Sequence, residues 1–105
     1  MIIIVHGPPA CGKTYNRDAL RQHFGATRIV DGWEPRTGNG HANIIGDRAQ
    51  SRQEETARRG QLFDNDLLLT TASPAEISGA KQLHGRSFAI HPFDSAIEAA
   101  GGRRA

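Results

Sequence analysis

Residues 7–14 are the part of the sequence whose residue types and spacing point most directly to chemistry. They read Gly-Pro-Pro-Ala-Cys-Gly-Lys-Thr and fit the pattern GxxxxGK[ST] in full. In this pattern, small residues let backbone N–H groups turn inward around a phosphate, and the helix that follows adds positive potential. Lys13 would supply a mobile cation for the β- and γ-phosphates, and the Thr14 hydroxyl would hold Mg²⁺. We therefore expect residues 7–14 to bind the triphosphate of a nucleotide together with Mg²⁺.

The expected nucleotide contacts extend along the whole motif and to the residue that follows it. They are Gly7, Pro8, Pro9, Ala10, Cys11, Gly12, Lys13, Thr14 and Tyr15. The two prolines remove two amide donors, but they stand at variable positions of the pattern, so we expect binding to survive. Cys11 lies beside a helix N-terminus that would favour its thiolate, and a purely structural role is the alternative. For the motif as a whole the alternative is an ordinary glycine turn.

Phosphoryl transfer or hydrolysis also needs an acidic residue at a strand end beside this loop. Asp31 fits best, because it ends a short apolar run on a strand that we expect to return next to the first strand. We therefore expect Asp31 and Thr14 to be metal ligands, and Asp31 to act in catalysis together with Lys13. The alternative for Asp31 is a turn residue that precedes Gly32.

A second polar strand end follows the leucine run at 67–69. Thr70 and Thr71 stand where many proteins with this loop carry Asp-Glu, so the usual catalytic base is missing. Thr71 is our third candidate catalytic residue, and slow turnover is the expected consequence. Asp64 and Asp66 precede the leucine run, so we expect them to be turn residues at the opposite end of the sheet.

Two stretches of the chain resemble the P-loop NTPase superfamily. Residues 1–31 carry the phosphate-binding motif between a strand and a helix, and Thr-Thr-Ala-Ser-Pro-Ala-Glu-Ile at 70–77 resembles the polar sensor strand and following turn of AAA-type ATPases. This resemblance, which extends over residues 67–93, implies that Thr70 or Thr71 contacts the γ-phosphate or the attacking water. The chain is too short for a complete AAA module and is similar to short P-loop ATPases of bacteriophages and prophages.

The elements that position the motif follow from the hydrophobic pattern. Residues 2–5 form a β-branched run typical of a strand covered on both faces. Residues 12–24 show an apolar stripe of helical period, and Gly25 is placed as the C-terminal cap. Residues 27–31 indicate a second strand, reached by a right-handed crossover. The motif is therefore expected at the strand–helix junction of a βαβ unit.

The second half of the chain continues this alternation of strands and helices. The leucine run indicates another buried strand, and residues 73–76 (Ser-Pro-Ala-Glu) fit a capping box with proline at the first helical position. Residues 87–90 indicate a weaker strand, and residues 92–100 a last helix. Together these patterns predict a small three-layer α/β fold of the P-loop NTPase type, with a mainly parallel sheet of about four strands.

Residues 32–63 give the weakest structural signal. This segment is polar, and two Glu–Arg pairs with i, i+4 spacing within residues 54–59 favour an exposed helix, with disorder as the alternative. We expect a mobile insertion here. We expect Trp33, at its start, to anchor a loop onto the core, and stacking on a base is the alternative.

Composition limits the classes of protein to consider. With 105 residues, 37% apolar and 6% aromatic, the chain predicts one small domain, residues 1–105. A net charge of +2 suits a nucleotide better than the dense basic face of a nucleic-acid binder. One cysteine excludes an internal disulfide framework, and the apolar N-terminal run is too short to span a membrane. We expect a cytoplasmic protein without membrane contact, with a protein partner or a second copy left open.

The sequence is compatible with three functions. The first is a minimal NTPase that binds ATP, or another nucleotide, with Mg²⁺ and hydrolyses it slowly. The second is a small-molecule or nucleotide kinase, which the acidic residue at the end of the second strand motivates. The third is a nucleotide-binding accessory protein of a phage or mobile element without turnover. Interaction with nucleic acid ranks last, because no aromatic platform or recognition helix accompanies the arginines.

Overall fold

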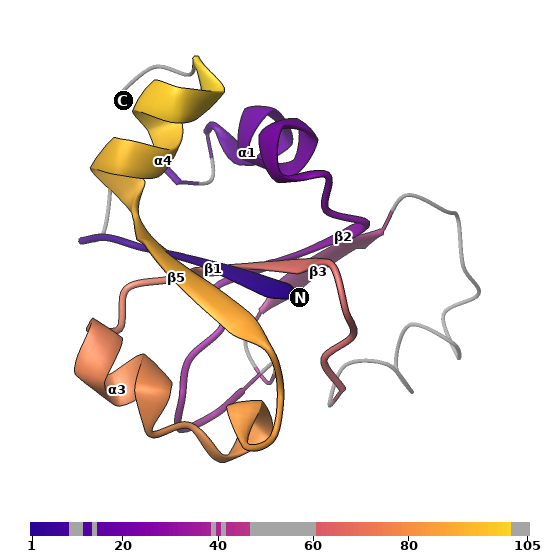
Figure 1. Cartoon of the computed structure of the whole chain (residues 1–105), viewed down its shortest axis with the longest axis vertical. Coiled ribbons are helices and arrows are strands. Elements are labelled where there is room, and N and C mark those ends of the chain that lie inside the picture. Colours follow the sequence, from indigo (N-terminus) through magenta and orange to yellow (C-terminus); the bar gives the residue numbers. More distant parts are fainter. Residues whose placement is uncertain (9–11, 14, 39, 41, 47–60, 102–105) are drawn as a thin grey trace.

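A five-stranded sheet forms the middle of the computed structural model, which describes residues 1–8, 12–13, 15–38, 40, 42–46 and 61–101 (Figure 1). Within these residues the strands are β1 (Ile2–His6), β2 (Arg28–Asp31), β3 (Asn43–Gly46), β4 (Asp66–Thr70) and β5 (Phe88–Pro92). Their order across the sheet is β3-β2-β4-β1-β5. Only the pair of β2 and β3 is antiparallel within this described sheet. The predicted α/β fold with a mainly parallel sheet is confirmed, with one strand more than expected.

β4, and not β2, lies beside β1. β4 pairs with β1 on one side and with β2 on the other, and all five of its residues are buried. Its leucine run offers apolar side chains to both faces, which favours a central position between two covered strands. The prediction that the strand of Asp31 returns directly next to the first strand is therefore wrong. The carboxyl ends of β1, β4 and β2 still share one edge, because Leu69 is in register with both Val5 and Asp31.

Helices cover both faces of the sheet and give the fold three layers (Figure 1). One face carries α1 (Arg17–Phe24) and α4 (Phe93–Ala100), and the other carries α3 (Pro74–Ser78) and the 3-10 turn η1 (Lys81–Leu83). Successive residues of a strand point to opposite faces, so β1 contributes to two cores. Val5 packs with Leu20 and Phe93 in the core beneath α1 and α4, whereas Ile4 packs with Ile77 in the core beneath α3.

α1 begins later than the helix that the sequence predicts over residues 12–24. Its first residue is Arg17, although the Asn16 N–H already donates to the Gly12 carbonyl at 3.0 Å. Gly12 has φ +107°, a value outside the right-handed helical region, and the Asn16 side-chain amide also donates to the Gly12 carbonyl at 2.9 Å. The end of the helix is as predicted, with Gly25 in the left-handed region at φ +65°.

The capping box predicted at residues 73–76 is present at the start of α3. The Glu76 N–H donates to Ser73 Oγ at 3.3 Å, and the Ser73 N–H donates to Glu76 Oε1 at 3.1 Å. Pro74 occupies the first helical turn. The hydrogen bond from the Ser73 backbone, followed by the one from its hydroxyl, lowers the pKa of the Glu76 carboxyl below its ordinary value of 4.5. Local hydrogen bonds therefore hold this short helix at the end of the segment that follows β4.

Replacing Ser73 with alanine is expected to destabilise the fold by about 1 kcal/mol, because the cap of α3 is lost. In a chain of this size the midpoint of thermal unfolding should fall by roughly 4–8 °C. The part of the loss that involves Glu76 is present above pH 4.5, because its folded pKa is lowered, and it shrinks as the pH falls through that lowered value. Ser95→Ala, at an exposed position of α4, is the control. An equal effect of both changes would contradict this assignment.

Part of the segment 32–63 belongs to the sheet. β3 pairs with β2 in antiparallel register, and Ile44 of this strand is buried. Leu62, near the other end of the segment, is also buried and belongs to the core beneath α3. β3 was not predictable from the sequence, because its run of two isoleucines is too short to stand out from a polar segment. The predicted Glu–Arg pairs lie in residues 47–60, outside the described residues.

The amino ends of β2 and β4 are joined by a buried ion pair. Arg28 and Asp66 are in register as the first residues of their strands, and Arg28 Nε and Nη2 donate to the two oxygens of Asp66 at 3.0 and 2.7 Å. Asp64 lies in the preceding turn, as predicted. Asp66 lies at the predicted end of the sheet, but it is a buried strand residue and the prediction of a turn residue is wrong for it.

Candidate functional site

The predicted phosphate loop leaves the sheet at the carboxyl end of β1, between β4 and β5. Gly7 and Pro8 follow β1, and Gly12 and Lys13 precede α1, whereas residues 9–11 and 14 lie outside the described residues. The Gly7 N–H donates to the carbonyl oxygen of Thr70 at 3.2 Å. The start of the loop is therefore attached to the end of β4.

Lys13 joins the two ends of this loop. Its Nζ donates to the carbonyl oxygen of Gly7 at 2.7 Å and to that of Pro8 at 2.9 Å, and the residue is only 8% exposed. Charge-assisted hydrogen bonds of this kind are roughly twice as strong as neutral ones. The ammonium group is consequently held at the carboxyl edge of the sheet, at the beginning of the loop.

Asp31 lies two strands away from the loop. Because β4 separates β2 from β1, the Cα atoms of Asp31 and Val5 are about 9–10 Å apart across the sheet. Asp31 Oδ2 lies 3.7 Å from Arg17 Nη1, and the Asp31 side chain is 14% exposed. This ion pair connects the end of β2 to the first turn of the helix that follows the loop.

The two threonines at the end of β4 differ in their surroundings. Thr70 is 1% exposed, and its Oγ1 accepts a hydrogen bond from the Ala72 N–H at 3.1 Å. Thr71 is exposed and directly follows the residue whose carbonyl binds Gly7. Of the two hydroxyls, that of Thr71 is therefore the more accessible at this edge.

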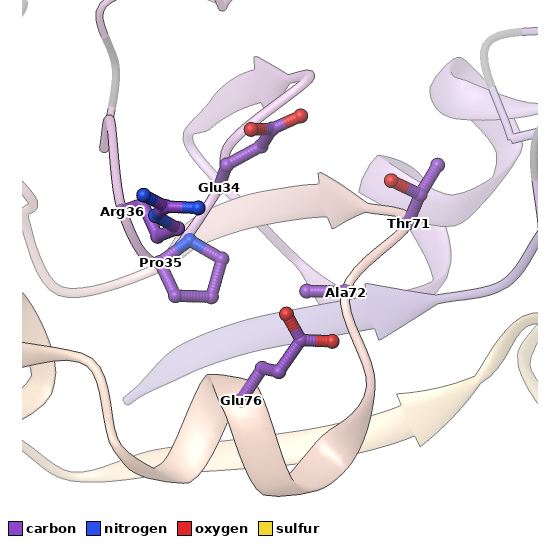
Figure 2. A pocket seen from close by; sticks show the side chains of 6 residues that line it. All are labelled: Glu34, Pro35, Arg36, Thr71, Ala72 and Glu76. Carbon is purple, nitrogen blue, oxygen red and sulfur yellow. The ribbon is translucent and has the colours of Figure 1, made fainter.

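A cavity of about 270 Å³ opens beside Thr71, on the side of the sheet that carries α3. Figure 2 shows its lining residues, which come from the segment after β2, the end of β4 and α3. They are Glu34, Pro35, Arg36, Thr71, Ala72 and Glu76. Glu34, Arg36 and Glu76 were not among the site residues predicted from the sequence. Glu34 lies three residues past Asp31, so its position just beyond a strand end was the one available signal.

A second hollow, of about 200 Å³, lies on the other side of the loop. It is lined by His6, Gly7, Pro8, Pro92, Phe93 and Asp94. Its walls therefore combine the start of the loop with the junction of β5 and α4. His6, the last residue of β1, contributes to this hollow from the sheet edge.

The remaining predicted residues are spread over the molecule. Tyr15 is 72% exposed beside the loop. Trp33 is fully buried and its Nε1–H donates to Gln82 Oε1 at 2.6 Å, so it anchors its loop onto the core as expected. Pro9, Ala10, Cys11 and Thr14 lie outside the described residues.

Comparison with known proteins gives no match. No protein-family model fits the sequence, and no curated protein or solved structure is significantly similar to it. Among the helices of the described residues, none combines the length and the apolar character that crossing a membrane requires. The described residues also contain no group of three or more His, Cys, Asp or Glu side chains arranged around a metal position.

Proposed function

We propose that this chain binds a nucleoside triphosphate with Mg²⁺ at residues 7–14 and hydrolyses it slowly. The observation that carries the proposal is the position of Lys13, whose ammonium lies 2.7 and 2.9 Å from two carbonyl oxygens at the start of the loop. Phosphate oxygens that enter the loop would replace these carbonyls as acceptors and would form stronger, ion-paired hydrogen bonds. The carboxyl edge of an open α/β sheet is also where ligands of such folds commonly bind.

The segment that surrounds Lys13 supports this assignment. β1 is a nearly buried parallel strand, the loop follows it directly, and α1 begins shortly after Lys13. The N-terminus of a helix favours a bound anion. On this basis we assign the phosphate contacts to the whole motif and to Tyr15, and we place the chain in the P-loop NTPase superfamily as part of the proposal.

Mg²⁺ would be held by the Thr14 hydroxyl, the phosphates and the Asp31 carboxylate. Asp31 fits this role for two reasons. Carboxylate oxygens are suitable ligands for Mg²⁺, and Asp31 lies at the carboxyl edge of the sheet. Arg17 neutralises part of its charge at 3.7 Å. This favours contact with the ion through a water molecule over direct coordination, because Mg²⁺ retains several waters.

Slow hydrolysis is proposed because the strand next to the loop ends without an acid. Thr71 offers a hydroxyl in place of a carboxylate, and a hydroxyl orients water without accepting its proton readily. Its location one residue past the Thr70–Gly7 hydrogen bond supports Thr71 as the residue nearest to the terminal phosphate.

Titration of Mg–ATP and Mg–GTP into the protein by calorimetry, with phosphate release followed on the same samples, tests the proposal. We expect saturable binding and slow release of phosphate. In Asp31→Asn protein, binding should persist while its dependence on Mg²⁺ weakens, since the substitution removes the metal-binding charge. Absence of binding by either nucleotide would refute the proposal, and binding without release would reduce it to nucleotide binding alone.

A further inference from the structure

β5 forms one edge of the sheet, and part of its backbone points away from the other strands. The Ile2 N–H donates to the Ser87 carbonyl at 2.9 Å, so the backbone groups of Ser87 are directed toward β1. This direction alternates along a strand, and the N–H and C=O groups of Phe88 and Ile90 are therefore directed outward. Among the described residues, none provides a hydrogen-bond partner for these outward groups. In Figure 1, β5 lies in front of the other strands and no described segment passes over it.

The side chains of β5 do not protect this edge. Exposed edge strands commonly carry charged residues, because their unpaired N–H and C=O groups attract another strand. β5 contains no Lys, Arg, Asp or Glu, and its one proline, Pro92, is its last residue. Phe88 and Ile90 pack against the core beneath α3, but both are only partly buried. An uncharged edge with two incompletely covered apolar side chains favours a further strand beside it.

A second copy of β5 would satisfy this edge in one particular register. When two copies pair in antiparallel fashion about a two-fold axis at Ala89, Phe88 of each copy lies opposite Ile90 of the other. Both residues direct their backbone groups outward, so each such pair exchanges two hydrogen bonds and symmetry doubles that number. Each Phe88 ring then contacts an isoleucine, and aromatic–β-branched pairs of this kind stabilise sheets. Ala89 faces its own copy, where its small side chain permits the close approach of the strands.

The charges that flank β5 are complementary in the same arrangement. The segment before β5 carries basic residues, whereas α4, which follows β5, carries acidic residues and no basic one. The basic residues are Lys81, His84 and Arg86, and the acidic ones are Asp94 and Glu98. Antiparallel pairing places the basic segment of one copy beside the start of α4 of the other, and symmetry repeats this contact. A parallel arrangement would place like charges side by side.

We propose that β5 pairs with β5 of a second copy of this chain, which gives a symmetric dimer with one sheet continuous across both copies. A two-fold contact uses the same surface on both copies, and an outward row of N–H and C=O groups is complementary to itself. Because the paired strands are antiparallel, the two carboxyl edges, and with them the two candidate phosphate loops, lie at opposite ends of the dimer. The contact requires neither nucleotide nor Lys13, so this proposal and that of nucleotide binding can fail separately.

Sedimentation velocity of the nucleotide-free protein, combined with hydrogen exchange measured by NMR, tests the inference. Small interfaces give weak complexes, so concentrations from about 10 μM to about 1 mM are compared. The mass should rise from 11.4 kDa toward twice that value. The Phe88 and Ile90 amides should exchange at least about fivefold more slowly at the highest concentration, because only the dimer protects them. The Ala89 amide, which is directed toward β1, should show no such change.

A charge reversal at the flank of β5 tests the arrangement. Asp94→Lys should raise the dissociation constant of the dimer at least about tenfold, since symmetry introduces the like-charge contact twice. Asp18→Lys makes the same change of charge at an exposed position of α1, which contacts β2 at a distance from the β5 edge. This control should leave the dissociation constant unchanged.

Three results would overturn the inference. The first is a mass that stays at 11.4 kDa over the whole range of concentration. The second is a dimer in which exchange of the Phe88 and Ile90 amides does not depend on concentration, because its interface would then lie elsewhere. The third is an equal effect of Asp94→Lys and Asp18→Lys. Lys13→Met protein separates the two proposals, since it should lose nucleotide binding and still dimerise.

Discussion

Replacement of Lys13 with methionine is expected to weaken binding of Mg–ATP at least about 100-fold, which corresponds to about 2.8 kcal/mol of binding free energy. The substitution keeps the length and apolar volume of the side chain and removes its charge. Hydrogen bonds to charged groups contribute roughly 1.5–3 kcal/mol each, and the ammonium would form more than one with the β- and γ-phosphates. Calorimetric titration of both proteins under identical Mg²⁺ and salt concentrations measures the change.

The chain offers a matched control, because its only other lysine is Lys81. Lys81 is exposed on η1, on the face of the sheet opposite α1, so Lys81→Met should leave nucleotide binding unchanged. Thermal unfolding of each variant separates loss of binding from loss of the fold, since Lys13 also joins the ends of its loop. If both variants bound Mg–ATP as tightly as the wild type, Lys13 would have no part in binding and the loop would not be a phosphate site.

Features encoded over a few adjacent residues were predictable from the sequence. The capping box at residues 73–76 and the left-handed Gly25 after α1 depend on local hydrogen bonds and on backbone sterics, so their residue types are diagnostic. The strand of residues 2–5 and the leucine strand were predictable for a related reason. A run of large apolar residues in a polar chain has few stable places other than the middle of a covered sheet.

The order of the strands was not predictable in the same way. β4 lies between β1 and β2 because of the way the apolar faces of the whole chain fit together. No local pattern near Asp31 carries this information. The expectation of a direct β1–β2 neighbour relied on adjacency in the sequence. Sequential strands are often neighbours, but a more buried strand displaced β2 here. The distance between Asp31 and the loop was underestimated as a result.

The cavity beside Thr71 could not be predicted from the sequence for a similar reason. Its residues come from three separate parts of the chain, and each has an ordinary local explanation: Glu76 completes a cap, Glu34 begins a tight turn and Thr71 directly follows a strand. Only their arrangement in space places two carboxylates around one cavity. The phosphate loop could be recognised because its residues are contiguous, whereas this cavity required the structure.

Breaking the buried ion pair at the other end of the sheet is expected to give the largest loss of stability. Arg28 is 8% exposed and Asp66 1%, and Asp66 Oδ2 also accepts the Phe63 N–H at 2.8 Å. Asp66→Ala would leave the Arg28 guanidinium buried without its carboxylate, which typically costs about 3–5 kcal/mol. Small domains are stable by only roughly 5–15 kcal/mol, so the midpoint of urea unfolding should fall sharply.

Asp64→Ala is the control for this change, because it removes a nearby carboxylate that is 73% exposed. Its ion pairs with Arg86 and the N-terminus are at the surface, where such pairs contribute at most about 1 kcal/mol.

A double variant, Arg28→Met with Asp66→Leu, shows why Asp66→Ala loses stability. If the unpaired charge is what destabilises Asp66→Ala, replacing both groups with apolar side chains of similar size should restore most of the stability. If the double variant were as unstable as Asp66→Ala, two other hydrogen bonds would hold this end of the sheet: the one that Asp66 accepts from the Phe63 N–H and the one that Arg28 donates to the Gln61 carbonyl.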